Sequence, residues 1–281
     1  MKLERAILQT LVYHDIFDYP LKAEEIHRYQ IGERASRGQI DNSLKLLEKN
    51  KKIKSQSGLF FLKGRKKIIK LRQSRGRFTR AKLKRAKLYA RLLMAIPTIK
   101  LVAISGALAM ENAQKKDDID LVIIASKNTL WTTRLLANIL LQPFRRKAGE
   151  PHTKDKACLN LFLEEYNLKI GTQNLYTAHE VAQMRPLWQR QNTYHRFLKA
   201  NTWVKNYLPN WQASSADSTF AFPQLGIIQL FEKLAKNLQL FYMKKKITTE
   251  KIGKHQLFFH PKDTQNLVLK MYVRKLQKLL N

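Results

Sequence analysis

Residues 101–124 read LVAISGALAMENAQKKDDIDLVII, and this stretch decides the fold of the middle of the chain. An apolar run ends in Ser105 and Gly106, and twelve residues after the glycine Asp118 and Asp120 open a second apolar run. Alternate residues of a strand point to the same side, so the two carboxylates converge as a hard cation such as Mg²⁺ requires. A glycine turn can offer backbone N–H groups to phosphates, and the pattern therefore predicts chemistry on a nucleoside triphosphate (NTP).

The pattern resembles the minimal nucleotidyltransferase domain of the polymerase-β superfamily over roughly residues 99–170. The signature of that family is an apolar residue, a Gly-Ser or Gly-Gly turn, a spacer, and acid-x-acid at the start of a strand. The resemblance implies that Asp118 and Asp120 are the catalytic acids that bind Mg²⁺ or Mn²⁺. It also implies that Ser105, Gly106 and Ala107 hold the phosphates of the NTP substrate.

Two positions depart from this family pattern. Ala107 stands where the family has Ser or Gly, so a hydroxyl donor is absent although the backbone N–H remains. A third carboxylate is expected on a later strand, and Asn160 occupies that position within residues 157–164. A carboxamide can coordinate a metal but cannot take up a proton. Glu164 shares the strand face with Asn160 but lies about 13 Å further along, at ~3.3 Å per residue.

The spacer between the glycine turn and the acid pair is basic. Lys115 and Lys116 precede the acids. They are candidates for neutralising charge on the leaving pyrophosphate, and they could equally be solvated loop lysines.

The chain is long and strongly basic. Its 281 residues predict two or three domains, and its formal net charge of +32 favours a polyanionic partner. Residues 63–100 contain many Lys and Arg and no acid. This run could bind nucleic acid, lie on an anionic membrane surface, or be a solvated helix face. We expect no transmembrane helix, no disulfide because Cys158 is the single cysteine, and a cytoplasmic location.

Residues 1–75 have the order of a winged helix-turn-helix module: three helices followed by a hairpin with a glycine turn. The third helix, with Ser36 as its N-cap, would enter the major groove. The candidate nucleic-acid contacts are Arg37, Gln39 and Asn42 on this helix and Lys82, Lys84 and Arg85 on the following basic helix. A protein-interaction or purely structural role is the alternative for this module.

The rest of the chain completes an α+β or α/β fold. A long basic helix is expected over residues 64–95, with a break near 74–76. Its later part, a basic linker over 76–97, would lead to a nucleotidyltransferase-like α/β domain over 98–175 and a helical region over 176–281. The α/β domain would hold a small mixed sheet with its helices mainly on one face. Trp188, Trp203 and Trp211 are predicted to be core anchors. The expected strands are 99–105, 120–125, 157–163 and 168–172, and the later helices are 177–184, 189–207, 225–245 and 264–280.

Two functions remain open at this stage. The first is an enzyme that moves a nucleoside monophosphate from an NTP to a hydroxyl of a small molecule, an RNA or a protein. The second is a catalytically degenerate protein of the same fold that acts as a winged-helix nucleic-acid-binding regulator. No zincin, hydrolase-elbow, Walker or dinucleotide-binding motif occurs in the sequence. Catalytic turnover separates the two functions.

Overall fold

The computed structural model describes residues 2–147, 149–212, 231–244, 251–259 and 264–280. Three helices, α1 (Lys2–Asp15), α2 (Ala23–Arg28) and α3 (Arg37–Lys49), precede a hairpin of β1 (Ile53–Gln56) and β2 (Leu59–Leu62). This is the element order that the sequence predicts for the first 75 residues. Ser36 caps α3 as expected, because its hydroxyl accepts a hydrogen bond from the Gln39 N–H.

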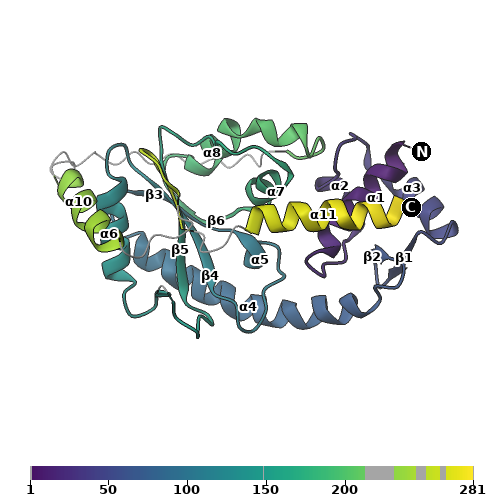
Figure 1. Cartoon of the computed structure of the whole chain (residues 1–281), viewed down its shortest axis with the longest axis horizontal. Helices are drawn as coiled ribbons and strands as arrows, with labels where there is room; N and C mark the ends of the chain where they lie inside the picture. The colour runs from purple at the N-terminus through teal and green to yellow at the C-terminus, as the bar shows by residue number, and fades with distance from the viewer. Residues whose placement is uncertain (1, 148, 213–230, 245–250, 260–263, 281) are drawn as a thin grey trace.

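One long helix, α4 (Lys67–Leu93), joins the N-terminal helices to the rest of the molecule. It runs along one side of the molecule (Figure 1). The break expected near residues 74–76 is absent, because Gly76 keeps a negative φ and the Ser74 hydroxyl bonds back to the Leu71 carbonyl. Arg75, in the middle of the helix, links it to two other segments by donating hydrogen bonds to the Phe17 carbonyl and to the Asn112 side chain.

The sheet is mixed, as predicted, and its described part has six strands in the order β6-β3-β4-β5-β8-β7. Among these strands β4 and β5 pair in parallel, and the other neighbours are antiparallel. The bounds are β3 (Ile99–Ile104), β4 (Ile119–Ala125), β5 (Ala157–Glu164), β6 (Arg185–Gln189), β7 (Lys251–Ile252) and β8 (Gln256–Phe258).

Three predictions for the sheet and its surroundings are wrong. Residues 168–172 form no strand. The range 189–207 is not one helix, because edge strand β6 ends at Gln189 and a left-handed turn at Gln191 and Asn192 precedes α8 (Thr193–Ala200) and a 3₁₀ helix (Thr202–Asn206). Helices cover both faces of the sheet rather than mainly one.

Two apolar cores lie on opposite faces of the sheet, because alternate residues of β3 and β4 point in opposite directions. Val102 and Ile123 pack with α4, with α6 (Leu130–Leu140) and with α10 (Glu232–Met243). Ala103 and Val122 pack with α7 (Leu175–Gln183), α8 and α11 (Thr264–Leu280). Figure 1 shows α11 extending from beside the sheet to α1.

The structure tests the predicted burial of the tryptophans and part of the helices predicted for the C-terminal half. Trp203 and Trp211 are buried, as predicted, and Trp188 packs at the edge of the core that contains α4. The helix expected at 225–245 begins outside the described residues, and α10 covers its later part. The helix expected at 264–280 is confirmed as α11. Among the described residues, no helix has the length and apolar character needed to cross a membrane.

Buried aromatic rings join α1 to α7. Tyr13 stacks on His179 at a centroid distance of 3.9 Å, and the His14 and His179 rings meet edge to face at 5.1 Å. The Nε2 atoms of both histidines are buried without a hydrogen-bond partner. Burial therefore lowers the pKa of His14 to about 4 and shifts the pKa of His179 in the same direction.

We predict that these histidines make the fold sensitive to acid. The native state holds these histidines neutral, whereas the unfolded state takes up protons at an ordinary pKa of 6.5. The free energy of unfolding is therefore unaffected by them above pH 6.5 and decreases as the pH falls toward 4. His14 should account for about 1.4 kcal/mol per pH unit in this window. Asp120 and Glu180, whose pKa values are raised, act in the opposite direction between pH 4 and 7. The measurement is therefore a comparison of urea unfolding at pH 7 and 5 in wild type and His14→Phe. A pH response that is identical in the two proteins would contradict the prediction.

Candidate metal and nucleotide site

Antiparallel pairing brings the glycine turn beside the acid pair. Ile104 at the end of β3 lies opposite Leu121 near the start of β4, and the Ser105 N–H donates to the Asp120 carbonyl at 3.2 Å. The chain then turns at Gly106, whose φ is +60°. A Cβ built on Gly106 would lie 3.1 Å from Asp120 Oδ2, so any residue with a side chain here would force the carboxylate to shift. Gly106, Ala107 and Asp120 line one cavity of about 250 Å³, named here the acid-pair cavity.

Asp118 and Asp120 lie side by side, as their spacing predicts. One oxygen of each carboxylate and Cys158 Sγ all lie within 4.8 Å of one another. Loss of hydration, and secondarily the Asp118 charge, raises the pKa of Asp120 to about 7. Burial and the two acids raise the pKa of the Cys158 thiol, whose S–H donates a hydrogen bond to Asp120. A bound cation would relieve the unfavourable charge on Asp120.

Arg146 is the counter-ion of Asp118. Its guanidinium donates to Asp118 Oδ2 at 2.8 Å, and both side chains are partly exposed. Asp118 and Asp120 raise the pKa of Arg146, which therefore stays charged. Asp118 does not line the acid-pair cavity. The pair of acids therefore presents one neutralised carboxylate and one that has no cationic partner among the described residues.

Two residues of β5 stand near the position where the resemblance implies a third acid. Cys158 is the register partner of Asp120 and reaches the acid pair. Asn160 is an extra residue in β5, because Leu121 pairs with Leu159 and Val122 already pairs with Leu161. Bulges of this kind re-aim side chains next to active sites. Asn160 is 3 % exposed, and its carboxamide oxygen has no hydrogen-bond partner. Glu164 lies away from the acids, where it bonds His255 at 2.7 Å.

Sequence reasoning missed a carboxylate on α7. Glu180 lines the acid-pair cavity together with Asp120 and Asn160. Burial raises the pKa of Glu180 to about 7, and its charge contributes to the raised pKa of Asp120. The chain pattern indicates only that residues 177–184 are helical. The face of that helix that meets the sheet depends on tertiary packing, so no local signal singles out Glu180.

Of the remaining residues predicted to bind phosphate, two line the acid-pair cavity and two do not. Ser105 and Ala107 line the acid-pair cavity. Lys115 and Lys116 are exposed on the loop before β4 and do not line the cavity. The Lys115 carbonyl accepts a hydrogen bond from Lys82 at 3.4 Å. This loop is therefore fastened to α4 through its backbone, while its two lysine side chains face solvent.

The candidate base-reading residues of α3 are mostly engaged within the protein. Arg37 binds Asp41 at 3.0 Å and Glu24 at 2.9 Å. The Gln39 side chain completes the cap by accepting from the Ser36 N–H at 2.8 Å. Asn42 is exposed. Contact between α3 and bases would therefore require Arg37 and Gln39 to exchange their present partners.

The phosphate contact predicted for Lys82 is wrong. Lys82 is 1 % exposed, and its ammonium donates to the Asp117 carbonyl and to Asp155 Oδ1. Lys84 and Arg85 are exposed, and Arg85 pairs with Asp155 at 3.2 Å. Helix periodicity explains the difference, because residues 82 and 84 lie on different faces of α4. The buried lysine holds the loop before the acid pair.

Comparison with family models, with curated proteins and with solved structures found no match for this chain. The functional argument therefore depends on the geometry and chemistry of the site itself.

Gly106→Ala should reveal how closely the turn fits the acid pair. The left-handed φ should cost about 1–2 kcal/mol of unfolding free energy, and the new methyl group should displace the Asp120 carboxylate. The matched control is Gly38→Ala inside α3, where φ is not positive and the added Cβ meets nothing within 4 Å. That substitution should stabilise by about 0.5–1 kcal/mol. Urea unfolding of both variants is the measurement, and equal changes would contradict the prediction.

Proposed function

We propose that this protein is a Mg²⁺-dependent nucleotidyltransferase that moves a nucleoside monophosphate from an NTP to a hydroxyl acceptor. The observation that carries the proposal is the approach of Gly106 to Asp120, with 3.1 Å from a built Cβ to the carboxylate. A turn suited to phosphate thus lies beside a carboxylate pair suited to a cation, and Asp120 of that pair lines the same cavity as the turn. This is the combination that the resemblance to the polymerase-β superfamily leads us to expect.

The acid pair fits a hard divalent cation. Asp118 and Asp120 would hold Mg²⁺ or Mn²⁺ through carboxylate oxygens, which hard cations prefer to the sulfur of Cys158. The raised pKa of Asp120, about 7, supports a cation at this position because the charged carboxylate is poorly stabilised by the protein alone. When bound, the ion would stabilise negative charge on the attacking and leaving oxygens.

The chain's own residues then have separate tasks. The backbone of Ser105, Gly106 and Ala107 would bind the phosphates. The acceptor oxygen would bond to the α-phosphorus while the bond from that phosphorus to the bridging oxygen breaks, and pyrophosphate would leave. The acceptor proton needs a base, which Asn160 cannot be. Glu180 is the carboxylate in the same cavity that best fits this task, with a pKa of about 7.

The test is incubation of the full chain with each labelled NTP and Mg²⁺ or Mn²⁺. Release of pyrophosphate together with transfer of the labelled nucleoside monophosphate to an acceptor, or to the protein, is the expected result. Absence of both NTP binding and pyrophosphate release with every NTP and either metal would refute the proposal. The variant that controls for contaminating activity is Asp120→Asn, treated in the Discussion.

A second candidate function is nucleic-acid binding without catalysis, as in a winged-helix regulator. The observation that favours it is a row of six exposed cations on α4 without a hydrogen-bond or ion-pair partner among the described residues. We name this row the α4 stripe; it consists of Lys70, Arg77, Arg80, Lys84, Lys87 and Arg91. The loss of a third carboxylate at Asn160 is consistent with it. Turnover in the NTP assay separates the two functions, and both can hold in one protein.

A further inference from the structure

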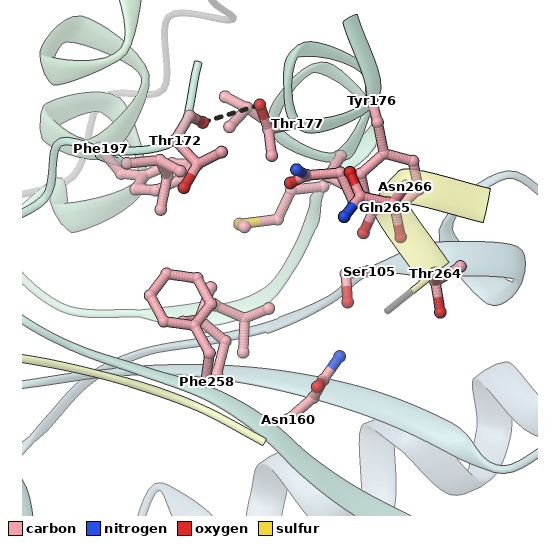
Figure 2. A pocket seen from close by; sticks show the side chains of 16 residues that line it. Ser105, Asn160, Thr172, Tyr176, Thr177, Phe197, Phe258, Thr264, Gln265 and Asn266 are labelled. Atoms are coloured by element: carbon pink, nitrogen blue, oxygen red, sulfur yellow. Dashed lines mark hydrogen bonds between the residues drawn. The ribbon is translucent and has the colours of Figure 1, made fainter. Parts of the chain in front are cut away.

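A second cavity adjoins the acid-pair cavity. It measures about 400 Å³ and lies between β4 and β5 on one side and α7, α8 and α11 on the other. We name it the apolar cavity, because its deeper wall is formed by Val122, Leu161, Ile170, Val181, Met184, Phe197 and Phe258. In Figure 2, Phe197 and Phe258 face each other across this space. A volume of this size suits a drug-sized ligand.

Polar side chains without partners stand where the two cavities meet. Ser105, Asn160, Tyr176 and Glu180 line both cavities. The Asn160 oxygen is buried and unpaired, and Ser105 makes no side-chain cap. Among the described residues, neither Tyr176 nor Glu180 has a hydrogen-bond or ion-pair partner. Figure 2 shows Ser105 and Asn160 pointing into the opening.

Unpaired polar groups at such depth are unusual. Asn160 is 3 % exposed, and its buried carboxamide oxygen without a partner among the described residues destabilises the protein. Buried polar groups in proteins are nearly always hydrogen-bonded. A ligand that offers both a donor and an acceptor at this opening would satisfy them together.

The charge of the walls limits what the ligand can be. The chain has 53 Lys and Arg among 281 residues, yet among the described residues that line either cavity none is Lys or Arg. Asp120 and Glu180 are the ionisable acids there. An anionic group in the apolar cavity would meet no cationic side chain from the described part of the chain, and it would face the Glu180 carboxylate. The walls therefore select against RNA and against other phosphate-bearing acceptors.

We propose that the apolar cavity binds a neutral small molecule with an apolar body, whose hydroxyl group lies at the opening among Ser105, Asn160, Tyr176 and Glu180. This inference rests on the proposed function only in identifying that molecule as the acceptor. Its hydroxyl then lies in the space shared with Asp120, next to the turn that would hold the triphosphate. Nucleotidyl transfer would form the bond between that hydroxyl oxygen and the α-phosphorus and release pyrophosphate.

Binding is tested without any nucleotide, using three matched probes on the full chain. The probes are 2-naphthol, 2-methoxynaphthalene, which lacks the hydroxyl donor, and 2-naphthoate, which is anionic at pH 7. Calorimetric titration should show that 2-naphthol binds about five- to tenfold more tightly than the methyl ether, since one hydrogen bond contributes about 1 kcal/mol. 2-Naphthoate should bind most weakly. Equal or tighter binding of 2-naphthoate would overturn the inference.

Two variants assign the preference to the opening. Asn160→Leu and Glu180→Gln should each reduce the affinity ratio of 2-naphthol to 2-methoxynaphthalene by several-fold. A general loss of stability would weaken the binding of both probes equally and would leave this affinity ratio unchanged. Asn50→Leu and Glu33→Gln are exposed controls of the same chemistry and should leave the ratio unchanged. A ratio that persists in both Asn160→Leu and Glu180→Gln would also overturn the inference.

The outcomes separate this inference from the proposed function. Selective binding of 2-naphthol in a protein without NTP turnover would retain the ligand site and reject its role as an acceptor site. NTP turnover in a protein that does not bind 2-naphthol would reject the neutral-acceptor inference and leave the nucleotidyltransferase proposal intact. With both present, 2-naphthol should become labelled from the NTP, and the product should disappear in Glu180→Gln.

Discussion

Asp120→Asn is expected to change stability and nucleotide binding in opposite directions. The native state raises the pKa of Asp120 to about 7, compared with an ordinary value of 3.8. The charged carboxylate therefore destabilises the metal-free protein above pH 7, and this penalty disappears as the pH falls below 3.8. The neutral amide should increase the free energy of unfolding by a few kcal/mol at pH 8 and by little at pH 4. The same variant should lose Mg²⁺-dependent NTP binding and about 10³-fold or more of any turnover, as loss of several kcal/mol of metal stabilisation implies.

The measurements are urea unfolding at pH 8 and 4 with and without Mg²⁺, and NTP titration in the presence of the metal. Mg²⁺ should stabilise the wild-type protein and not the variant, because a cation stabilises only the state that binds it. Asp41→Asn is the control: its carboxylate is partly exposed and pairs with Arg37 on the surface of α3. It should change stability by less than about 1 kcal/mol. Unchanged Mg²⁺-dependent NTP affinity in Asp120→Asn would show that this acid does not hold the metal.

The acid pair could be predicted from the sequence because its geometry is local. Asp118 lies immediately before β4 and Asp120 lies within it, so a spacing of two residues is enough to place their side chains together. The antiparallel neighbour β3 ends two residues before Gly106 and so brings the turn beside them. No other contact is needed. The N-terminal helices and hairpin were predictable for the same reason, since their periodicity and the Ser36 cap lie within short segments.

Contacts that depend on distant segments were not predictable. Glu180 reaches the cavity because α7 belongs to the core on the same sheet face as Val122 and Leu161, and β8 adds to the sheet beside β5 from a segment nearly 100 residues later. The sequence did not predict strand β6, because its five residues are too few to show a clear alternation of apolar and polar side chains. It also contains Pro186, which is tolerated in an edge strand but argues against a strand in a sequence-based prediction. Lys82 was misassigned because charge alone does not tell a phosphate ligand from a buried anchor.

The second large expected effect concerns the α4 stripe, which we expect to bind duplex nucleic acid through phosphates. From Lys70 to Arg91 the six cations recur at helical spacing over about 31 Å, at 1.5 Å per residue, on the exposed side of α4. None of them has an acidic partner among the described residues, in contrast to Arg72, Arg75 and Arg85 on the same helix. Unpaired charges need not break existing ion pairs in order to bind phosphate.

If all six cations contact phosphate, log affinity should fall with log salt with a slope of about −5, and affinity should drop roughly 10³-fold between 50 and 200 mM salt. Sequence should matter little, because phosphate contacts carry no base information and Arg37 and Gln39 of α3 are already engaged.

The deciding experiment compares two triple charge reversals in the full chain by fluorescence anisotropy with duplex DNA. Arg80→Glu, Lys84→Glu and Lys87→Glu remove half of the α4 stripe, and should weaken binding at least 10²-fold at 50 mM salt and reduce the salt slope by nearly 3. Lys199→Glu, Lys205→Glu and Lys233→Glu change the net charge equally at exposed positions on other elements, and should have a much smaller effect. Equal losses in the two variants would mean that net charge, and not the α4 stripe, attracts DNA. Binding that ignores salt would exclude the phosphate mechanism, whereas a stripe-dependent, salt-dependent affinity would place a polyanion along α4, on the opposite face of the sheet from the apolar cavity.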